Sequence, residues 1–352
     1  MDFDEILAMF SPLTLTESVN LMRGTEPLLL TSRLGKNEVN SLDETCVFEV
    51  EEGSYNLAPM GYSGDPASNV NIARSVKPYA VTPPQIFMKD RITANEINRV
   101  RMAAQNPINM TLQDKNAAYN KLIGDKQQGL NRLIERRIEW LFAQVLRGKI
   151  SYMSDTGRAF EHDFKLPKAV DIHNEFWNKA TDPGNPVHQL RHIAKYFKEI
   201  NNQLSPDLIL LGGAAGDAFM DNPHVEEWLK SPGVQLFQNR TNLAKGEAVP
   251  IGQLQGQGGE LFEYSATYED NKGKAIPYIE EDYVYMTNSS LWRLHYGAIN
   301  DFDAGNPPLV LGSRFSKMKV SEDGKALDIF VESHPLPVVV SNLCVVKAKV
   351  VD

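Results

Sequence analysis

Cysteine is scarce in this sequence, and its scarcity argues against a fold held together by disulfides. Only two cysteines, Cys46 and Cys344, occur in 352 residues, far apart and without a CxxC partner. A disulfide framework is therefore not indicated, and a reducing compartment is the natural setting. We expect both thiols to be small buried apolar groups.

Long apolar runs are also missing, which argues against a membrane protein. The best candidate, residues 336–346, is interrupted by Pro337, Ser341 and Asn342. It falls short of the roughly 20 apolar residues that span a bilayer. The first ten residues are acidic and lack the basic region of a signal peptide. We therefore expect a soluble protein that is made in the cytoplasm and has no membrane partner.

An excess of positive charge is missing as well. The formal net charge is -9 and the sequence pI is about 5.4, so the chain repels phosphate and specific nucleic-acid binding is not expected. The hydrophobic fraction of 42% allows a sizeable packed core and argues against wholesale disorder. The length suits two or three domains.

Convincing catalytic and ligand-binding motifs are not found either. The segment DLILLGGAAGDAF has the strand–turn–helix context of a phosphate-binding loop, but Gly212, Gly213 and Gly216 lack the GxGxxG spacing. We interpret them as a tight turn that packs a helix onto a sheet, with a phosphate-binding α/β enzyme as the alternative. His188 and His192 lie four residues apart without a third zinc ligand. We therefore predict no catalytic residue, no cofactor and no metal site.

A long proline-rich connection is the most informative feature that is present. Residues 45–52 alternate, with Cys46, Phe48 and Val50 on one face, and predict a half-exposed strand. Residues 53–84 then contain five prolines and no helical periodicity, yet carry many apolar side chains. A connection this long does not belong inside a compact domain. If it projects, its apolar groups bury against a neighbouring subunit; an ordinary loop folded onto its own domain is the alternative.

A long helix is predicted after this connection. Thr93 and Glu96 form a capping-box pattern that begins a first helix, and Asn106-Pro107 breaks it. A second, longer helix is expected from about Thr111 to Arg147, stopped by Gly148. At about 1.5 Å per residue it is roughly 50 Å long. Its first half is polar, so its own domain packs against only part of its length. Apolar residues recur at spacings of three and four at Leu130, Leu133, Ile134, Ile138, Leu141, Phe142 and Val145.

The other expected elements are short. No strong element is predicted in the first 40 residues, and no internal repeat is found. We expect strands at 85–92, 208–211, within 231–287 and within 338–351, helices at 187–201 and 214–220, and hairpins across 151–164 and 315–331.

Four stretches, taken together in their order and spacing, point to a known family. They are YNLAPMGYSGDPASN with RSVKPYAVTPPQIFMKDRITANEINRVR (residues 55–101), GLNRLIERRIEWLFAQVLRGKISYM (129–153), DLILLGGAAGDAFMDNPHVEEWL (207–229) and MTNSSLWRLHYGAINDF (286–302). Their order is similar to that of the major capsid proteins of tailed bacteriophages, in particular the lambda-type capsid E family. The resemblance covers nearly the whole chain.

The resemblance implies an α+β fold of the Hong Kong 97 capsid type. The implied parts are an N-terminal arm (1–40), an E-loop hairpin (41–92), a peripheral domain with the spine helix (93–186), an axial domain (187–300) and return strands of the peripheral domain (301–352). The expected function is a non-enzymatic major capsid protein that self-assembles into hexamers and pentamers of an icosahedral head enclosing double-stranded DNA. An encapsulin-like protein compartment has the same fold and stays the alternative.

The resemblance also implies where subunits meet and where the chain bends. Beyond copies of itself, the expected partners are a separate scaffolding protein, a portal and a decoration protein. The expected location is the virion, after synthesis in the host bacterial cytoplasm. The hinge candidates are Gly53 in the E-loop and Gly124 and Gly129 in the spine helix. The side chains expected to contact a neighbouring subunit are Phe48, Tyr55, Leu57, Tyr62, Arg74, Lys77 and Tyr79.

Overall fold

The chain divides into two units, each built from several separate stretches of sequence. The computed structural model describes residues 11–22, 28–52, 75–93, 95–96, 112–153, 157–173, 175–179, 183–229, 248–253, 259–270, 272–322 and 324–352. Unit 1 comprises Met1–Val47, Ala80–Leu141 and Leu294–Pro337, and unit 2 comprises Phe48–Tyr79, Phe142–Arg293 and Val338–Asp352.

The predicted long helix is confirmed as α5, Leu112–Arg147. It ends where Gly148 takes a positive φ of 108°, a conformation that glycine adopts without strain. The apolar row along its second half is buried, with one exception. Leu133 is 53% exposed, so its predicted core position is wrong. Polar residues of α5 form the rest of its buried face, and Leu133 lies outside that face.

The N-terminal segment is more ordered than the sequence suggested. It forms α2 (Pro12–Leu21), α3 (Leu29–Leu34) and the strand β1 (Glu38–Asn40), which corrects the prediction of no strong element. Ser11 caps α2 by accepting a hydrogen bond from the Thr14 N–H, and proline follows at the first helical position. Leu15 and Val19, one helical turn apart, are buried. This capping and spacing is a signal that the sequence does carry.

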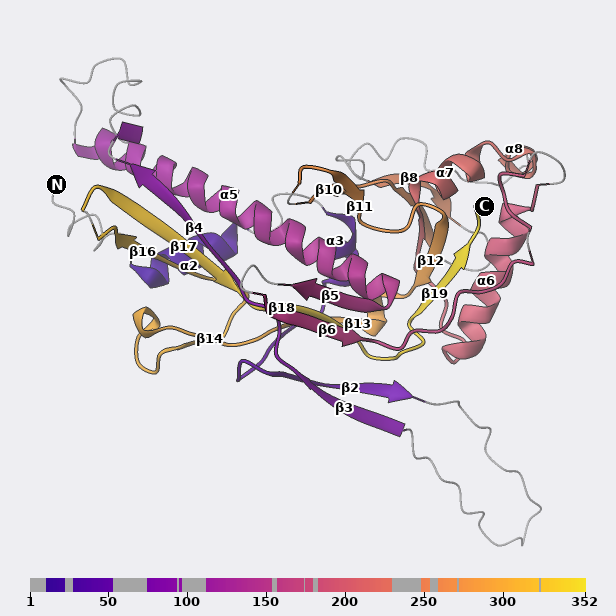
Figure 1. Ribbon diagram of the computed structural model, residues 1–352, viewed down its shortest axis with the longest axis horizontal. Helices are drawn as coiled ribbons and strands as arrows, with labels where there is room; N and C mark the ends of the chain where they lie inside the picture. Colours follow the sequence, from indigo (N-terminus) through magenta and orange to yellow (C-terminus); the bar gives the residue numbers. More distant parts are fainter. Residues whose placement is uncertain are drawn as a thin grey trace, which may run out of the picture. The chain divides into compact units, whose positions relative to one another are not determined.

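An antiparallel sheet in unit 1 joins segments far apart in the sequence. Its order is β16–β17–β4, with β16 at Phe315–Val320, β17 at Ala326–Ser333 and β4 at Ile86–Thr93. These strands match the predicted hairpin at 315–331 and the predicted strand at 85–92. Helix α2 contacts β16, and the sheet runs along the first part of α5 (Figure 1).

Shorter elements complete unit 1 and lead into unit 2. Strand β13 (Trp292–Tyr296) lies between β1, to which it is parallel, and β18 (Pro335–Val339). Strands β14 (Ile299–Asn300) and β15 (Leu309–Val310) form a small antiparallel pair. Two short 3-10 helices are present, η1 at Ser289–Leu291 and η2 at Phe302–Ala304.

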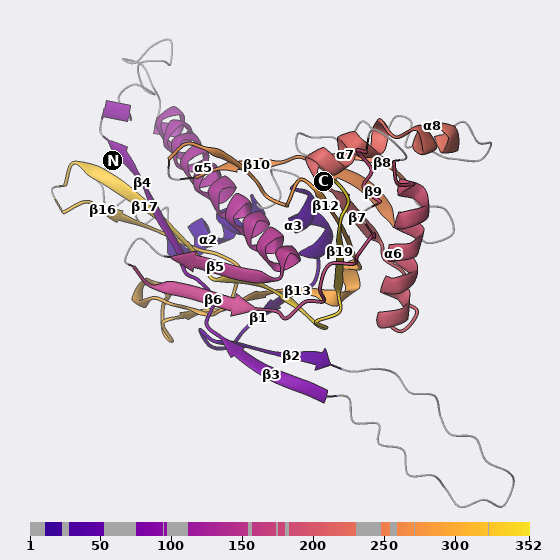
Figure 2. The same ribbon diagram turned by 45° about the vertical axis from the view of Figure 1, so that its right-hand side comes forward.

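Unit 2 is built on a five-stranded sheet covered by helices. The strand order is β19–β12–β7–β9–β8, with the parallel pair β7/β9 inside it. The core joins the sheet to α6 and α7 through Leu190, Phe197, Ile209 and Phe219, and Figure 2 shows these helices beside the sheet. The bounds are β7 Leu208–Leu211, β8 Ala248–Gln253, β9 Glu260–Tyr264, β12 Tyr283–Thr287, β19 Val345–Lys349, α6 Pro186–Ile200, α7 Gly213–Met220 and α8 Pro223–Leu229.

Three two-stranded ribbons accompany this sheet. Strands β5 (Lys149–Met153) and β6 (Ala159–Asp163) form the predicted hairpin across 151–164. Strands β10 (Thr267–Glu269) and β11 (Ala275–Pro277) form another. The third, β2 (Cys46–Glu52) with β3 (Ser75–Val81), belongs to the long proline-rich connection.

Candidate functional site

Strands β2 and β3 form a ribbon at the long connection that the sequence predicts to project from its domain. Cys46, Phe48 and Val50 are buried and the residues between them are exposed, which confirms the predicted alternation. The two strands run in opposite directions (Figure 1) and form a sheet of their own. Strand β3 was missed because Pro78 lies inside it, and proline is accepted only in strands that leave an edge unpaired.

An aromatic cluster holds the two strands of the ribbon against β6. The rings of Phe48 and Tyr79 stack with centroids 5.8 Å apart. The ring of His162 meets both edge-on, at 6.0 Å and 5.8 Å, and lies 4.6 Å from Phe164. Burial in this cluster lowers the pKa of His162 below its ordinary value, because the charged imidazolium loses its hydration. Aromatic packing therefore fixes the root of the ribbon, meaning the part near the start of β2 and the end of β3.

The predicted contact residues divide into three groups. Phe48 is buried by its own chain, while Lys77 is exposed and Tyr79 is partly exposed. Whether these side chains contact a neighbouring subunit stays a prediction. The hinge candidate Gly53 lies outside the described residues. So do four of the predicted contact residues, Tyr55, Leu57, Tyr62 and Arg74.

Polar contacts within unit 1 fix the start of β2 and the end of β3. The Thr45 and Thr82 hydroxyls lie 3.2 Å apart, and the Ala298 N–H donates to the Asp43 carbonyl at 3.0 Å. Gly297 is required here, since a Cβ at that position would lie 2.7 Å from the Glu44 carbonyl oxygen. The start of β2 is therefore held by close backbone contacts with residues 297–298, and the end of β3 is held by Thr45.

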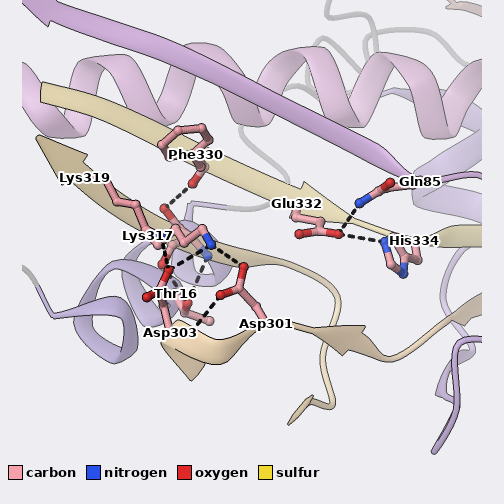
Figure 3. A network of polar contacts seen from close by, with 10 residues as sticks. Thr16, Gln85, Asp301, Asp303, Lys317, Lys319, Phe330, Glu332 and His334 are labelled. Carbon is pink, nitrogen blue, oxygen red and sulfur yellow. Dashed lines mark hydrogen bonds and ion pairs between the residues drawn. The ribbon is translucent and has the colours of Figure 1, made fainter. Parts of the chain in front are cut away.

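A buried carboxylate at the end of β17, that of Glu332, lies between Gln85 and His334 (Figure 3). Glu332 accepts a hydrogen bond from the Gln85 side-chain amide at 2.6 Å and lies 3.0 Å from His334 Nε2. The other ring nitrogen, Nδ1, lies 3.2 Å from the Ala298 carbonyl oxygen. Both ring nitrogens therefore face acceptors.

A second cluster of charged side chains, also shown in Figure 3, stabilises the turn after β14. The Lys317 ammonium bridges Asp301 and Asp303, and Lys319 also reaches Asp303 at 2.8 Å. The hydrogen bonds from Lys319 and Lys317 lower the pKa of Asp303. Thr16 of α2 joins the network by accepting from the Ser316 N–H at 3.0 Å, so the N-terminal helix is part of the same arrangement.

Helix α5 carries a row of buried polar side chains that the apolar pattern did not reveal. The members are spaced four residues apart, so they lie on one helix face. Their four-residue spacing is present in the sequence, but only apolar residues at helical spacing indicate a buried helix face. They are Gln127, Asn131, Glu135 and Glu139, each at most 4% exposed.

The row binds the N-terminal helices to α5. Glu139 accepts from the N–H groups of Leu30 and Thr31 at 2.8 Å and 2.7 Å and from the Thr31 hydroxyl. It therefore caps the first turn of α3, where unpaired N–H groups and the helix dipole favour a negative charge. Asn131 donates to the Val19 carbonyl at 2.8 Å, next to the end of α2.

A buried arginine pairs with two residues in the middle of the row. Arg314, 1% exposed, donates to the Asn131 side-chain oxygen at 2.7 Å and lies 3.5 Å from the Glu135 carboxylate. A buried carboxylate without such a partner would be strongly destabilising. Thus α5, the N-terminal helices and the residue before β16 form one polar core.

The two hinge candidates in α5 lie within a continuous helix. A Cβ added at Gly129 would meet nothing within 4 Å, and one added at Gly124 would meet only the Met22 methyl at 3.9 Å. Packing therefore does not require glycine at either position. Their role as hinges stays a prediction.

The glycine turn after β7 is built for packing. A Cβ at Gly212 would lie 2.3 Å from the Glu280 carbonyl oxygen, and one at Gly216 would lie 2.5 Å from Glu263 Cγ. The Ala215 N–H, which would face a phosphate, donates to the Glu281 carbonyl at 2.9 Å. The surrounding groups are acidic and repel phosphate. The geometry therefore gives no support to a phosphate-binding enzyme using Gly212–Gly216.

The described residues hold neither a metal-ligand cluster nor a membrane-spanning helix. His188 and His192 are exposed on α6, and no group of three or more metal-ligating side chains is found in the described ranges. Among the described helices, none has the length and hydropathy needed to span a bilayer. Cys46 and Cys344 are both buried free thiols, as predicted.

The fold and its elements define the class of protein. The architecture is that of a Hong Kong 97-like capsid protein. A crystal structure of a prophage capsid protein from Escherichia coli CFT073 matches with a TM-score of 0.65 and 18% identity, covering 95% of this chain and 96% of that one. A phage-related protein from Bordetella bronchiseptica RB50 matches with a TM-score of 0.53 and 10% identity, covering 95% of both chains.

The sequence then identifies the family within this class. The family model for phage major capsid protein E matches residues 11–350, and the chain belongs to that family. None of the curated proteins matches the chain in sequence. The chain is accordingly a structural subunit of a phage capsid, and copies of it assemble into the shell of the virion.

Proposed function

We propose that this chain forms the hexamers and pentamers of an icosahedral tailed-phage head that encloses double-stranded DNA. The family match across residues 11–350 carries the proposal. The role is structural rather than enzymatic. The acidic net charge of -9 suits a wall that must not hold packaged DNA tightly. Synthesis takes place in the host cytoplasm before assembly.

The domain assignments follow from this role. Residues 41–92 act as the E-loop hairpin, 187–300 as the axial domain, and 93–186 with 301–352 as the peripheral domain. The two-stranded β2–β3 ribbon supports the first assignment, because its strands pair with no third strand among the described residues. An extended element with free edges is suited to lie on a neighbouring chain.

The partners beyond the chain itself are a separate scaffolding protein, a portal and a decoration protein. A scaffolding partner predicts that shells of uniform size form only on co-expression with the neighbouring genes. Uniform shells from this chain alone would contradict that part of the proposal.

Negative-stain electron microscopy of the purified chain, alone and co-expressed, tests the assembly itself. Closed angular shells, tubes or capsomer rings are the expected result. A monodisperse monomer under every condition would contradict the proposed function. Nuclease treatment and extraction of shells from infected cells then distinguish a DNA-filled head from a compartment that holds protein cargo.

A further inference from the structure

Unit 2 exposes a basic helix face. Arg191 and Lys195, one turn apart on α6, are exposed, and His188 and His192 lie on the same side. Across the part of the chain that the structure describes, no ion pair or hydrogen bond engages the guanidinium of Arg191 or the ammonium of Lys195. Glu199 is the one acidic residue of this helix. The face is therefore positively charged in a chain whose net charge is negative.

A second face of unit 2 gathers negative charge. Asp217 and Asp221 are one turn apart at the end of α7, and both are exposed. Glu263 of β9 lies against Gly216, next to Asp217. Burial first, and the neighbouring Asp217 carboxylate second, raise the pKa of Glu263, because both disfavour its charged form. Within the described ranges, no cation pairs with any of the three.

The two faces lie on different flanks of one helical layer. Both helices pack on the same core, since Leu190, Phe197, Ala215 and Phe219 belong to one cluster. However, α6 contacts β12 and β19, whereas α7 contacts β7 and β9. In the sheet order β19–β12–β7–β9–β8, the first pair lies at one end and the second pair begins at the central strand. Figure 2 shows the two helices apart, with α8 beside both.

We propose that these faces are the two halves of one head-to-tail interface between copies of this chain. The α6 face of one subunit, through Arg191 and Lys195, contacts Asp217, Asp221 and Glu263 of the next. The inference rests on the proposed function, because a shell subunit must meet further copies of itself. Two different faces of one unit that complement each other give a heterologous contact, and such a contact closes into rings when the rotation allows.

Charge complementarity explains why each face carries unpaired charge in the single chain. Opposite charges across an interface set its register and favour correct partners, while like charges brought together are repelled. A cation from outside the chain would offset the repulsion between Glu263 and Asp217. A basic face from the next copy supplies that cation.

A charge-reversal rescue tests the pairing. Arg191→Glu with Lys195→Glu reverses one face, and Asp217→Lys with Asp221→Lys reverses the other. Each pair is expected to lower the yield of capsomers and shells by about tenfold or more, because like charges then meet at every contact. The four substitutions combined restore opposite charges and are expected to recover at least half of the wild-type yield, measured by sedimentation and electron microscopy.

A matched control carries the same charge change elsewhere in unit 2. Lys168→Glu with Lys272→Glu alters two exposed lysines, and its assembly is expected to equal that of the wild type. Circular dichroism and thermal unfolding of each subunit confirm that the fold is kept. Rescue that stays below half, or normal assembly of either reversed pair, overturns the inference while the proposed function stands. A wild-type chain that never assembles contradicts both.

Discussion

At the scale of single residues, burial and hydrogen bonding explain what the apolar pattern could not. The sequence predicted the face of α5 that carries Ile134 and Ile138, and both are buried. It did not predict that Glu139 on the same helix would be buried, because charged side chains are rarely enclosed unless their partners are known. Those partners come from a segment over 100 residues away, a separation that local pattern reasoning does not bridge.

Glu139→Gln tests the cap on α3. The amide has only one acceptor oxygen, so the N–H of either Leu30 or Thr31 would face its NH2 donor in place of a carboxylate oxygen. We expect a loss of about 2 kcal/mol in the free energy of unfolding, the usual cost of a buried unsatisfied group. Chemical denaturation of the unassembled subunit measures it. Glu17→Gln, at an exposed position of α2, is the control, and equal stability of the two variants would contradict the account.

His162 makes the root of the ribbon sensitive to acid. Its pKa is lowered in the folded chain from an ordinary value of 6.5. Above that pH the ring is neutral in both states and contributes nothing. As the pH falls through 6.5, the unfolded chain binds a proton that the folded chain does not, so stability falls until the folded pKa is reached.

The measurement compares unfolding of the wild type and His162→Phe at pH 7.5 and pH 5, two conditions that bracket the ordinary value. Phenylalanine keeps the aromatic packing and removes the titrating group. We expect a smaller loss of stability on acidification in the variant. The same loss in both proteins would show that His162 does not make this contribution.

At the scale of elements, regular segments were predictable and segments that depend on distant partners were not. Helix α6 follows from its own periodicity and capping, and strand β7 from its short continuous apolar run. Helix α3 and strand β3 do not: the first is completed by Glu139, and the second contains Pro78. Both are short elements whose stability comes from tertiary contacts rather than from local propensity.

The glycines of α5 provide a test of the hinge proposal. Gly129→Ala should raise the stability of the subunit by roughly 0.5–1 kcal/mol, because alanine loses less entropy in a helix and its Cβ meets nothing within 4 Å. If the helix must bend during assembly or expansion, the stabler subunit should yield fewer fully expanded shells. Particle diameters from electron microscopy, together with denaturant midpoints, measure both effects. Unchanged expansion would remove Gly129 as a hinge.

The connection between β2 and β3 can be shortened without touching either strand. Replacing residues 55–73 with a short glycine–serine turn leaves the Phe48–Tyr79 stacking and the Thr45–Thr82 contact in place. We expect a folded subunit with near-normal thermal unfolding and at least a tenfold loss of shells, as contacts with the neighbouring copy are removed. Normal shell yield would show that the E-loop is dispensable for assembly.

At the scale of the whole molecule, the order of the elements along the sequence predicted the fold. The long connection, the long helix and the glycine turn are each common in unrelated proteins. Only their succession along 352 residues is specific, and the family match over residues 11–350 confirms it. The contacts between copies were not predictable in the same way, because one chain shows only half of each interface.

The central claim is that this chain builds a closed icosahedral shell from rings of five and six copies. A cryo-electron microscopy reconstruction of the purified particle tests it most directly. We expect a shell composed of this chain, with the β2–β3 ribbon lying on an adjacent copy and the α6 face meeting Asp217 of the next. A chain that remains monomeric, or a particle in which the ribbon contacts only its own subunit, would contradict it.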